Sequence, residues 1–459
     1  MSNTLVLPTD LMSQLLAVVR EPDESAAVLL VSVVETNEGL RLLGRELWWV
    51  PDYGYARREP DRLTITSDGY VAALARAEAI GATALWLHTH PAPGSSPHPS
   101  VHDDKVNKQL AETFRIRTGS AYYGWVVVAP NGTGLTFSGE LCTEEQRRVI
   151  DRLWIIGDRW SMIRAHGSPD PAIPTAFDRN IRAFGGDVQV VLADLHVAIV
   201  GCGGTGSAVA EQVTRLGARH LRLFDPKSVS ESNPTRVYGS TPADVGRPKA
   251  EVVAAHLRRL APDAHVEAKV ASITTSAVAQ GITGSDLIFG CTDDNGGRLV
   301  LSRLSSYYLV PVIDCGVLLT SDASDQPVGI DGRVTTLTPR SACLVCRDRI
   351  DMARALSEAL SPGERARRQA DGYAVALPGV EPAVVTYTTA VAAAAVSELL
   401  ERLIGYGPTP RPSEVLLRFH DREISTNLAL PRPGHYCDPQ RGLLGKGDVH
   451  PFLDMTWSN

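Results

Sequence analysis

Short apolar runs and helix-like segments alternate along the first third of the chain. The runs at residues 26–34, 40–50, 82–90 and 122–130 are rich in Val, Leu and aromatic residues and are bounded by polar or turn residues, which is typical of buried strands. Residues 67–80 (SDGYVAALARAEAI) have instead the spacing of an amphipathic helix. The pattern predicts an α/β domain.

A periodic segment followed by helix breakers closes this first domain. Residues 143–163 (TEEQRRVIDRLWIIGDRWSMI) have a pattern that predicts a helix. The stretch AHGSPDPAIPTAF, which follows soon after, contains a glycine and three prolines, and these residues break regular structure. We therefore predict a first domain over residues 1–165 and a linker over 166–176.

The second half carries a different pattern, in which continuous apolar strands are separated by helical segments. The strands read HVAIV, HLRLF, DLIFG and VPVIDCGVLL, as a doubly wound parallel sheet requires. We predict a Rossmann-like domain over residues 177–430, with an Ala-rich helix near 386–403. The tail 431–459 gives no clear pattern.

Composition narrows the function classes. The 459 residues are 44% hydrophobic and 21% charged, which is ordinary for a globular protein, and the length suits two or three domains. A net charge of −7 without a basic run argues against nucleic acid as a partner. No apolar stretch approaches the ~18 residues of a membrane helix, and no leader pattern opens the chain, so we expect a cytoplasmic protein without a membrane partner. Seven scattered cysteines favour reduced thiols over disulfides.

A metal-ligand pattern lies at the end of the third apolar run. His88 and His90 are one residue apart on a strand, so their side chains project to the same side. Beyond a turn, Ser100-Val101-His102-Asp103 offers a carboxylate as a third ligand and a hydroxyl nearby. Three protein ligands and a water make an open, catalytic zinc site.

The order His88-x-His90-Pro91 and then Ser100-x-x-Asp103 resembles the JAMM motif of the JAB-family metalloisopeptidases. Nine residues (91–99) separate His90 from Ser100, a longer loop than is usual in that family. The resemblance implies that Glu24, ahead of the first apolar run, is the base that takes the proton of zinc-bound water, with Glu35 as its rival. It also implies that Ser100 stabilises the developing oxyanion.

A glycine-rich loop opens the second domain. It follows the strand HVAIV and precedes a helix, so its backbone approaches phosphates at a helix N-terminus. The glycines expected there are Gly201, Gly203, Gly204 and Gly206. Asp225 ends the next strand, where a carboxylate binds ribose hydroxyls. These features alone fit an NAD enzyme as well as an ATP enzyme.

Residues further along separate these two alternatives. The chain continues with a group of polar and charged side chains that a hydride-transferring enzyme does not need: Asn233, Arg236, Lys249, Asp293 and Arg298. Cations, an amide and a strand-end carboxylate are the equipment to bind a triphosphate with Mg²⁺ while a carboxylate attacks the α-phosphate.

Together these residues resemble the ThiF-like adenylating domain of ubiquitin-activating enzymes and of the activating enzymes of thiamine and molybdopterin synthesis, over about residues 177–405. The resemblance implies ATP and Mg²⁺ as cofactors. It assigns the ribose to Asp225, the phosphates to Asn233, Arg236 and Lys249, and Mg²⁺ to Asp293. Arg179, in a segment similar to the family's Arg-Gln-Ile helix, would act on the ATP of a neighbouring subunit, which implies a homodimer. Lys227 is a departure, since relatives often have an acidic residue there.

The cysteines of the second half suggest a further metal site. Cys343-x-x-Cys346 is the first half of a structural zinc site in relatives, which close it with a second pair near the C-terminus. Only Cys437 remains in the corresponding stretch, so either another residue such as His435 is the fourth ligand or no metal binds. No thioester-forming cysteine is identifiable, although Cys343 or Cys346 would be the candidate.

These motifs predict a bifunctional enzyme. Its partner would be a ubiquitin-like protein with a Gly-type C-terminus, which one domain adenylates and the other cleaves from a conjugate or precursor, and a conjugating enzyme is a further candidate partner. One alternative is an activating enzyme for a sulfur carrier or peptide in biosynthesis. Another is an inactive JAB-fold module that docks the modifier for the adenylating domain.

Overall fold

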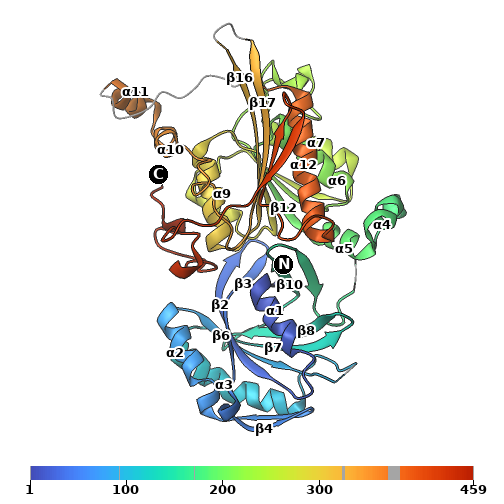
Figure 1. Ribbon diagram of the computed structural model, residues 1–459, viewed down its shortest axis with the longest axis vertical. Helices are drawn as coiled ribbons and strands as arrows, with labels where there is room; N and C mark the ends of the chain where they lie inside the picture. The colour runs from blue at the N-terminus through green and yellow to red at the C-terminus, as the bar shows by residue number, and fades with distance from the viewer. Residues whose placement is uncertain (1, 93, 170, 323–325, 371–382, 458–459) are drawn as a thin grey trace. The chain divides into compact units, whose positions relative to one another are not determined.

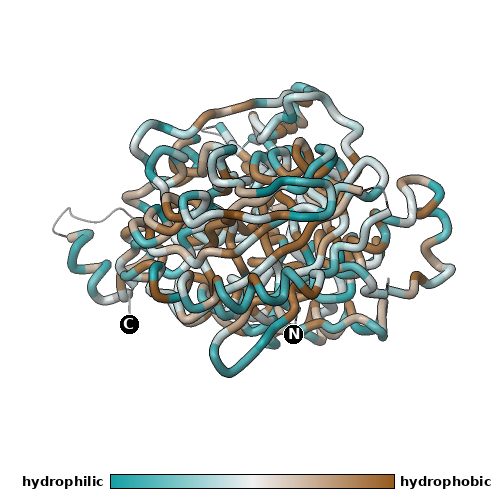
Figure 2. The backbone as a smooth tube through the Cα atoms, turned by 90° about the horizontal axis from the view of Figure 1, so that it is seen from below, coloured by the Kyte–Doolittle hydropathy of each residue, from teal (hydrophilic) through white to brown (hydrophobic). Residues whose placement is uncertain are grey.

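The computed structural model describes residues 2–92, 94–169, 171–322, 326–370 and 383–457. The chain forms two compact units (Figure 1). Unit 1 comprises Met1–Pro169 and Gly445–Asp448, and unit 2 comprises Asp170–Leu444 and Val449–Asn459. Figure 2 shows hydrophobic residues concentrated in the inner segments and hydrophilic residues in the outer loops. In the described part of the chain, no helix has both the length and the apolar character needed to cross a bilayer.

Unit 1 is built on a nine-stranded sheet of order β11-β10-β1-β3-β2-β6-β7-β8-β9. Its strands are β1 (Thr4–Pro8), β2 (Ala26–Thr36), β3 (Gly39–Trp49), β6 (Thr83–Thr89), β7 (Tyr123–Asn131), β8 (Gly134–Cys142), β9 (Arg147–Val149), β10 (Arg152–Ile156) and β11 (Ser161–Arg164). A separate hairpin consists of β4 (Tyr55–Glu59) and β5 (Arg62–Ile65), and the helices are α1 (Thr9–Val18), α2 (Val71–Ile80) and α3 (Val101–Thr118).

Strand β2 shows why this sheet is buried on both faces. Its residues Ala27, Leu29 and Val31 pack in a core with α1, whereas the alternate residues Val28 and Leu30 pack in a second core with α2 and α3. Because side chains alternate along a strand, a continuous apolar run fills both cores. The predicted α/β class is confirmed for this unit, and the sheet is mixed.

The predicted helix over residues 143–163 is wrong, since this segment forms β9, β10 and β11. All five residues of β10 are buried, and Leu153 and Ile155 face the core that contains α1. Strand β10 pairs in parallel with β1, with Thr4 opposite Arg152. This partner lies far away in the sequence, so tertiary pairing overrode the local helical pattern.

Unit 2 has an eight-stranded sheet of order β14-β13-β12-β15-β16-β17-β18-β19. Its strands are β12 (His196–Val200), β13 (His220–Phe224), β14 (His265–Lys269), β15 (Leu287–Gly290), β16 (Val312–Ser321), β17 (Pro327–Leu337), β18 (Glu414–Arg418) and β19 (Glu423–Asn427). The helices are α4 (Asp178–Phe184), α5 (Gly186–Asp194), α6 (Gly204–Arg215), α7 (Lys249–Leu260), α8 (Ser276–Gly281), α9 (Asn295–Tyr307), α10 (Met352–Glu358), α11 (Pro362–Ala370) and α12 (Val385–Ile404).

The parallel part of this sheet agrees with the predicted Rossmann-like pattern. Strands β14, β13, β12, β15 and β16 run parallel, whereas β17, β18 and β19 add an antiparallel extension that was not predicted. Figure 1 shows α9 on one side of the sheet and α6, α7 and α12 on the other. Helix α12 accounts for the predicted Ala-rich helix near 386–403. The carboxyl ends of the parallel strands, where ligands bind in such folds, therefore meet at one edge.

Candidate functional sites

The predicted zinc ligands of unit 1 come together at the end of β6. His88 lies in β6, His90 follows it directly, and Asp103 lies in the first turn of α3. Their ligand atoms form one cluster, with 3.2 Å between the two Nε2 atoms, 3.5 Å from His88 Nε2 to Asp103 Oδ1 and 3.7 Å from His90 Nε2 to Asp103 Oδ2. Two nitrogen ligands of one tetrahedral zinc ion lie about 3.3 Å apart, so the spacing fits this metal.

Hydrogen bonds outside the cluster orient its members. The carbonyl of Ser96 lies 2.8 Å from His90 Nδ1 and accepts its proton in the tautomer that leaves Nε2 free for a metal. The backbone N–H of Ser100 donates to Asp103 Oδ2 at 2.7 Å. Burial raises the pKa of Asp103, but hydrogen bonds from His88 and His90 outweigh it and hold that pKa below its ordinary value. The aspartate is therefore ionised, as a metal ligand must be.

Glu24 is placed as a general base would be. Its Oε1 lies 4.0 Å from His90 Nε2, and its side chain lines a cavity of about 420 Å³ together with Ser100, Asp103 and the turn between β4 and β5. Burial raises the pKa of Glu24 to about 7, in the range that suits proton transfer at neutral pH. The rival Glu35 lies at the far end of β2, on the order of 30 Å along the strand.

Ser100 has a structural task that the sequence pattern did not reveal. It is the N-cap of α3: its Oγ accepts from the Asp103 N–H at 3.2 Å, and Asp103 in turn accepts from the Ser100 N–H, as a capping box. A hydroxyl that accepts in this way keeps its own O–H donor. The predicted oxyanion role is therefore compatible with the cap. His102 lines the cavity, whereas His98 makes an edge-to-face contact with His166, with ring centroids 5.3 Å apart.

In unit 2 the glycine loop joins β12 to α6, and two of its positions admit only glycine. Gly201 has φ of 93°, and a Cβ there would lie 2.5 Å from the Cys291 carbonyl oxygen. A Cβ at Gly206 would lie 1.8 Å from the Gly201 carbonyl oxygen. At these two positions the backbone packs too closely against its neighbours for any side chain, whereas a Cβ at Gly203 would meet nothing within 4 Å. The loop leads the backbone to the N-terminus of α6.

Asp225 follows β13 and holds this loop in place. Its buried carboxylate accepts from the Cys202 N–H at 2.7 Å and from the Lys227 N–H at 2.8 Å. Each carboxylate oxygen can accept a second hydrogen bond, so the same group can also accept from ribose hydroxyls. The predicted ribose ligand is thus also a structural link between the loop and the following turn.

The predicted phosphate ligands lie on the turns after β13 and at the start of α7. Asn233 is buried, and its Oδ1 accepts from the Ser230 N–H at 3.1 Å. Arg236 is half-buried and donates to the Ser232 carbonyl at 2.9 Å. Lys249 begins α7. These contacts fix the turn and leave cationic groups at the carboxyl edge of the sheet.

Asp293, the predicted Mg²⁺ ligand, forms an ion pair with Lys227, the residue at which the sequence departs from its relatives. Lys227 Nζ lies 3.2 Å from each carboxylate oxygen of Asp293. Partial loss of hydration raises the pKa of Asp293, whose side chain is still 70% exposed, but the charges of Lys227 and, more weakly, Lys249 outweigh this effect and hold that pKa below its ordinary value. Arg179 is exposed on α4, as a residue that acts on a neighbouring subunit would be.

A buried ion group at the same edge was missed. Asp314 in β16 is fully buried, with Arg333 Nη2 2.8 Å from its Oδ2 and Arg298 Nε 3.5 Å from its Oδ1. Arg298, which the sequence suggested as a phosphate cation, is thus paired with a carboxylate. The sequence does contain a sign of this ion group, because Asp314 stands inside the apolar run VPVIDCGVLL. A charged residue in a buried strand indicates a partner of opposite charge.

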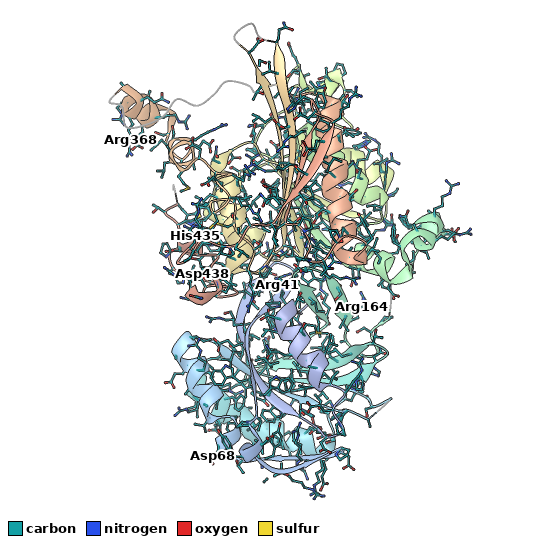
Figure 3. The ribbon with its side chains drawn as sticks, in the orientation of Figure 1. Arg41, Asp68, Arg164, Arg368, His435 and Asp438 are labelled. Atoms are coloured by element: carbon teal, nitrogen blue, oxygen red, sulfur yellow. The ribbon has the colours of Figure 1, made fainter. Side chains whose placement is uncertain are left out.

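The four candidate ligands of the second metal site also meet. Cys343 and Cys346 follow β17, whereas His435 and Cys437 follow β19 (His435 is labelled in Figure 3, beside Asp438). His435 Nδ1 lies 3.3 Å from Cys343 Sγ, 3.3 Å from Cys346 Sγ and 3.4 Å from Cys437 Sγ. The sulfur–sulfur distance from Cys346 to Cys437 is 3.6 Å.

These distances of 3.3–3.6 Å are close to the edges of a zinc tetrahedron, which are about 3.6–3.8 Å for bonds of ordinary length, and the nitrogen–sulfur distances are slightly shorter. Backbone N–H groups of Cys346 and Arg432 lie 3.4 Å from the sulfurs of Cys343 and Cys346, as donors that stabilise thiolates. A hydrogen bond from the Cys437 thiol lowers the pKa of Cys343. The donor set therefore fits a closed structural zinc site with His435 as the fourth ligand.

The ThiF family model matches residues 177–437, which is more than half of the 459 residues. The chain belongs to the ThiF family. This ThiF-family chain is 29% identical over 273 residues to the SAMP-activating enzyme E1 of Haloferax volcanii, covering 60% of this chain and 88% of the relative. It is 30% identical to the molybdopterin-synthase adenylyltransferase of Salmonella typhimurium (37% of this chain, 65% of the relative) and to the sulfur carrier protein ThiS adenylyltransferase of Escherichia coli (35% and 61%).

The family match decides between the two interpretations of the glycine loop. Unit 2 is an adenylating domain of the E1-like ThiF kind that uses ATP, and the NAD alternative is excluded. The match covers the glycine loop, Asp225, Lys249 and Asp293, as well as the Cys/His cluster up to Cys437.

Proposed function

We propose that this ThiF-family chain activates the C-terminal carboxylate of a ubiquitin-like protein. The observation that carries the proposal is the position of Asp225, Lys249 and Asp293 around the glycine loop, at the carboxyl edge of the parallel sheet. The relative with the longest matched segment among those described above is itself named as an activating enzyme, and 88% of its length is covered.

In this reaction a carboxylate oxygen of the modifier attacks the α-phosphorus of ATP, and pyrophosphate leaves. The glycine loop and the N-terminus of α6 receive the phosphates, while Arg236 and Lys249 offset their charge. Asp293 would hold Mg²⁺, which neutralises the leaving pyrophosphate when it is bound. The product is an acyl-adenylate ready for transfer to sulfur.

Unit 1 is proposed to be a zinc isopeptidase that acts on the same modifier. Its support is the cluster of His88, His90 and Asp103 with Glu24 at 4.0 Å from His90. These three ligands would hold zinc with one position open, and the metal supplies an activated water when it is bound. Glu24 would take the proton of this water and pass it to the leaving amine, and Ser100 would donate to the oxyanion.

A second candidate function for unit 2 is activation of a sulfur carrier in biosynthesis. Two relatives are named as adenylyltransferases of molybdopterin synthase and of a sulfur carrier protein. Mass spectrometry of the activated partner separates the two functions, because sulfur loading leaves a thiocarboxylate whereas conjugation leaves an isopeptide bond. For unit 1, a zinc content of zero after purification would favour the docking-module alternative.

The test of adenylation is ATP–pyrophosphate exchange with a purified candidate modifier. Asp293→Ala should abolish exchange because it removes the proposed Mg²⁺ ligand. Arg179→Ala should abolish it too, and mixing the two variants should restore part of the activity if Arg179 acts across a homodimer. Full exchange by Asp293→Ala would contradict the site assignment, and no recovery on mixing would contradict the dimeric site.

A further inference from the structure

Lys227 lies between three residues that are proposed to bind the nucleotide. Its backbone N–H donates to Asp225 Oδ1 at 2.8 Å, and its carbonyl accepts from the Lys249 N–H at 3.0 Å. Its Nζ lies 3.2 Å from both oxygens of Asp293. The backbone of Lys227 is thus fixed by the site itself, while its side chain reaches across to the proposed metal ligand.

The ion pair between Lys227 and Asp293 is poorly suited to a purely structural role. The two side chains are 60% and 70% exposed, and exposed pairs contribute little to stability because water and salt screen them. Either side chain of such an exposed ion pair can therefore leave the other for a more strongly charged partner. The ammonium nevertheless lies 3.2 Å from both oxygens of the carboxylate, and Lys249 adds a second positive charge that acts on it.

The charge balance changes when the nucleotide arrives. Before the nucleotide binds, the ammonium groups of Lys227 and Lys249 both act on the carboxylate of Asp293. They therefore repel a free divalent cation that approaches this carboxylate. A polyphosphate brings several negative charges, which attract the ammonium of Lys227 away from Asp293. The carboxylate then becomes available to the metal that accompanies the nucleotide.

We propose that Lys227 is a nucleotide-phosphate ligand that pairs with Asp293 until ATP binds, so that nucleotide binding favours formation of the metal site. This inference rests on the proposed adenylation function. It goes beyond that function by assigning a residue and an order of binding. A lysine at this position weakens metal binding in the absence of nucleotide, whereas an acidic residue would strengthen it.

The experiment uses the full chain loaded with zinc and two measurements that do not depend on turnover. The first is binding of Mn²⁺ without nucleotide, followed by electron paramagnetic resonance, with Asp293→Ala defining the signal of this site. The second is binding of ATP in the absence of divalent metal, followed by calorimetry. The variants are Lys227→Met, Lys227→Arg and the matched control Lys269→Met, in which an exposed lysine 3.4 Å from Glu267 is replaced.

Lys227→Met should change the two affinities in opposite directions. Mn²⁺ should bind about two- to fivefold more tightly because an exposed ion pair no longer competes. Metal-free ATP should bind about 10- to 100-fold more weakly because a charge-assisted hydrogen bond to phosphate is lost. Lys227→Arg should retain most of the ATP affinity, and Lys269→Met should change neither value.

Unchanged ATP affinity in Lys227→Met would overturn the phosphate-ligand role, and unchanged Mn²⁺ affinity would overturn the blocking role. A gain in Mn²⁺ binding that persists in the double variant Lys227→Met/Asp293→Ala would place the metal elsewhere and overturn the proposal as well. Failure of the proposed function looks different: the wild-type chain would bind ATP but give no exchange with any modifier, while the response of Lys227→Met stayed as expected.

Discussion

Replacing Asp225 tests whether its carboxylate holds the nucleotide loop as well as the nucleotide. The side chain is 5% exposed and accepts two backbone hydrogen bonds, from Cys202 and Lys227. Asp225→Asn keeps one acceptor oxygen and turns an NH₂ group toward the other N–H. At about 1.5–3 kcal/mol for each hydrogen bond to a charged group, the change should cost about 2–4 kcal/mol. Asp225→Ala loses both acceptors and should cost about 3–6 kcal/mol.

The assay is hydrogen exchange of the full chain followed by mass spectrometry, with peptides that cover β12, the loop and β13. A loss of about 3 kcal/mol speeds exchange there by roughly 100-fold if the amides open with unit 2. Peptides from β2 in unit 1 serve as an internal reference and should not change. The control variant is Asp263→Asn, because Asp263 is 59% exposed and pairs with Arg219 at 2.8 Å on the surface. If Asp225→Asn accelerates exchange no more than Asp263→Asn, the proposed structural link does not hold the loop.

Three further predictions concern the other sites. Glu24→Gln should keep zinc while cleavage of a modifier conjugate falls about 10²- to 10⁴-fold, since the base is lost and the ligands remain; loss of zinc, measured by metal analysis, would make Glu24 a ligand. Gly206→Ala should abolish ATP binding in calorimetry, because its Cβ would lie 1.8 Å from the Gly201 carbonyl oxygen, and normal binding would refute the loop geometry. Burial raises the pKa of Glu414, but Arg349 at 2.9 Å holds it below the ordinary 4.5, so the pair stabilises the fold above pH 4.5 and less as pH falls further. Glu414→Gln should therefore flatten the acid side of the stability curve of unit 2, and an unchanged curve would contradict this.

The sequence was most informative where chemistry depends on residues that are close along the chain. Strand alternation placed His88 and His90 on one side, and the structure brings Asp103 to them. The glycine loop needed only a strand and a helix around it to be located. Both features are local, so they could be read without knowing which strands pair.

What the sequence could not provide depends on distant partners. Strand β10 is a strand because β1 lies beside it, and nothing within residues 143–163 records that neighbour. The ion group of Asp314 and Arg333 joins β16 to β17, the first strand of the antiparallel extension, which itself was not predicted. In the sequence Lys227 is only a departure from relatives, and its role follows from its 3.2 Å distance to Asp293.

The membership of Gly445–Asp448 in unit 1 has a practical consequence for anyone who divides this protein. The polypeptide leaves unit 2 near residue 444, contributes four residues to unit 1 and returns at 449, so no single cut yields two complete halves. Gly447, with φ of 70°, sits so close to Val34 that a Cβ there would lie 2.8 Å from Val34 Cγ2. A fragment ending at residue 169 would expose the apolar surface that this segment covers. The proposed zinc and ATP reactions are therefore best compared by point substitution in the intact chain, because a truncated fragment that failed to cleave would report on missing packing as much as on missing catalysis.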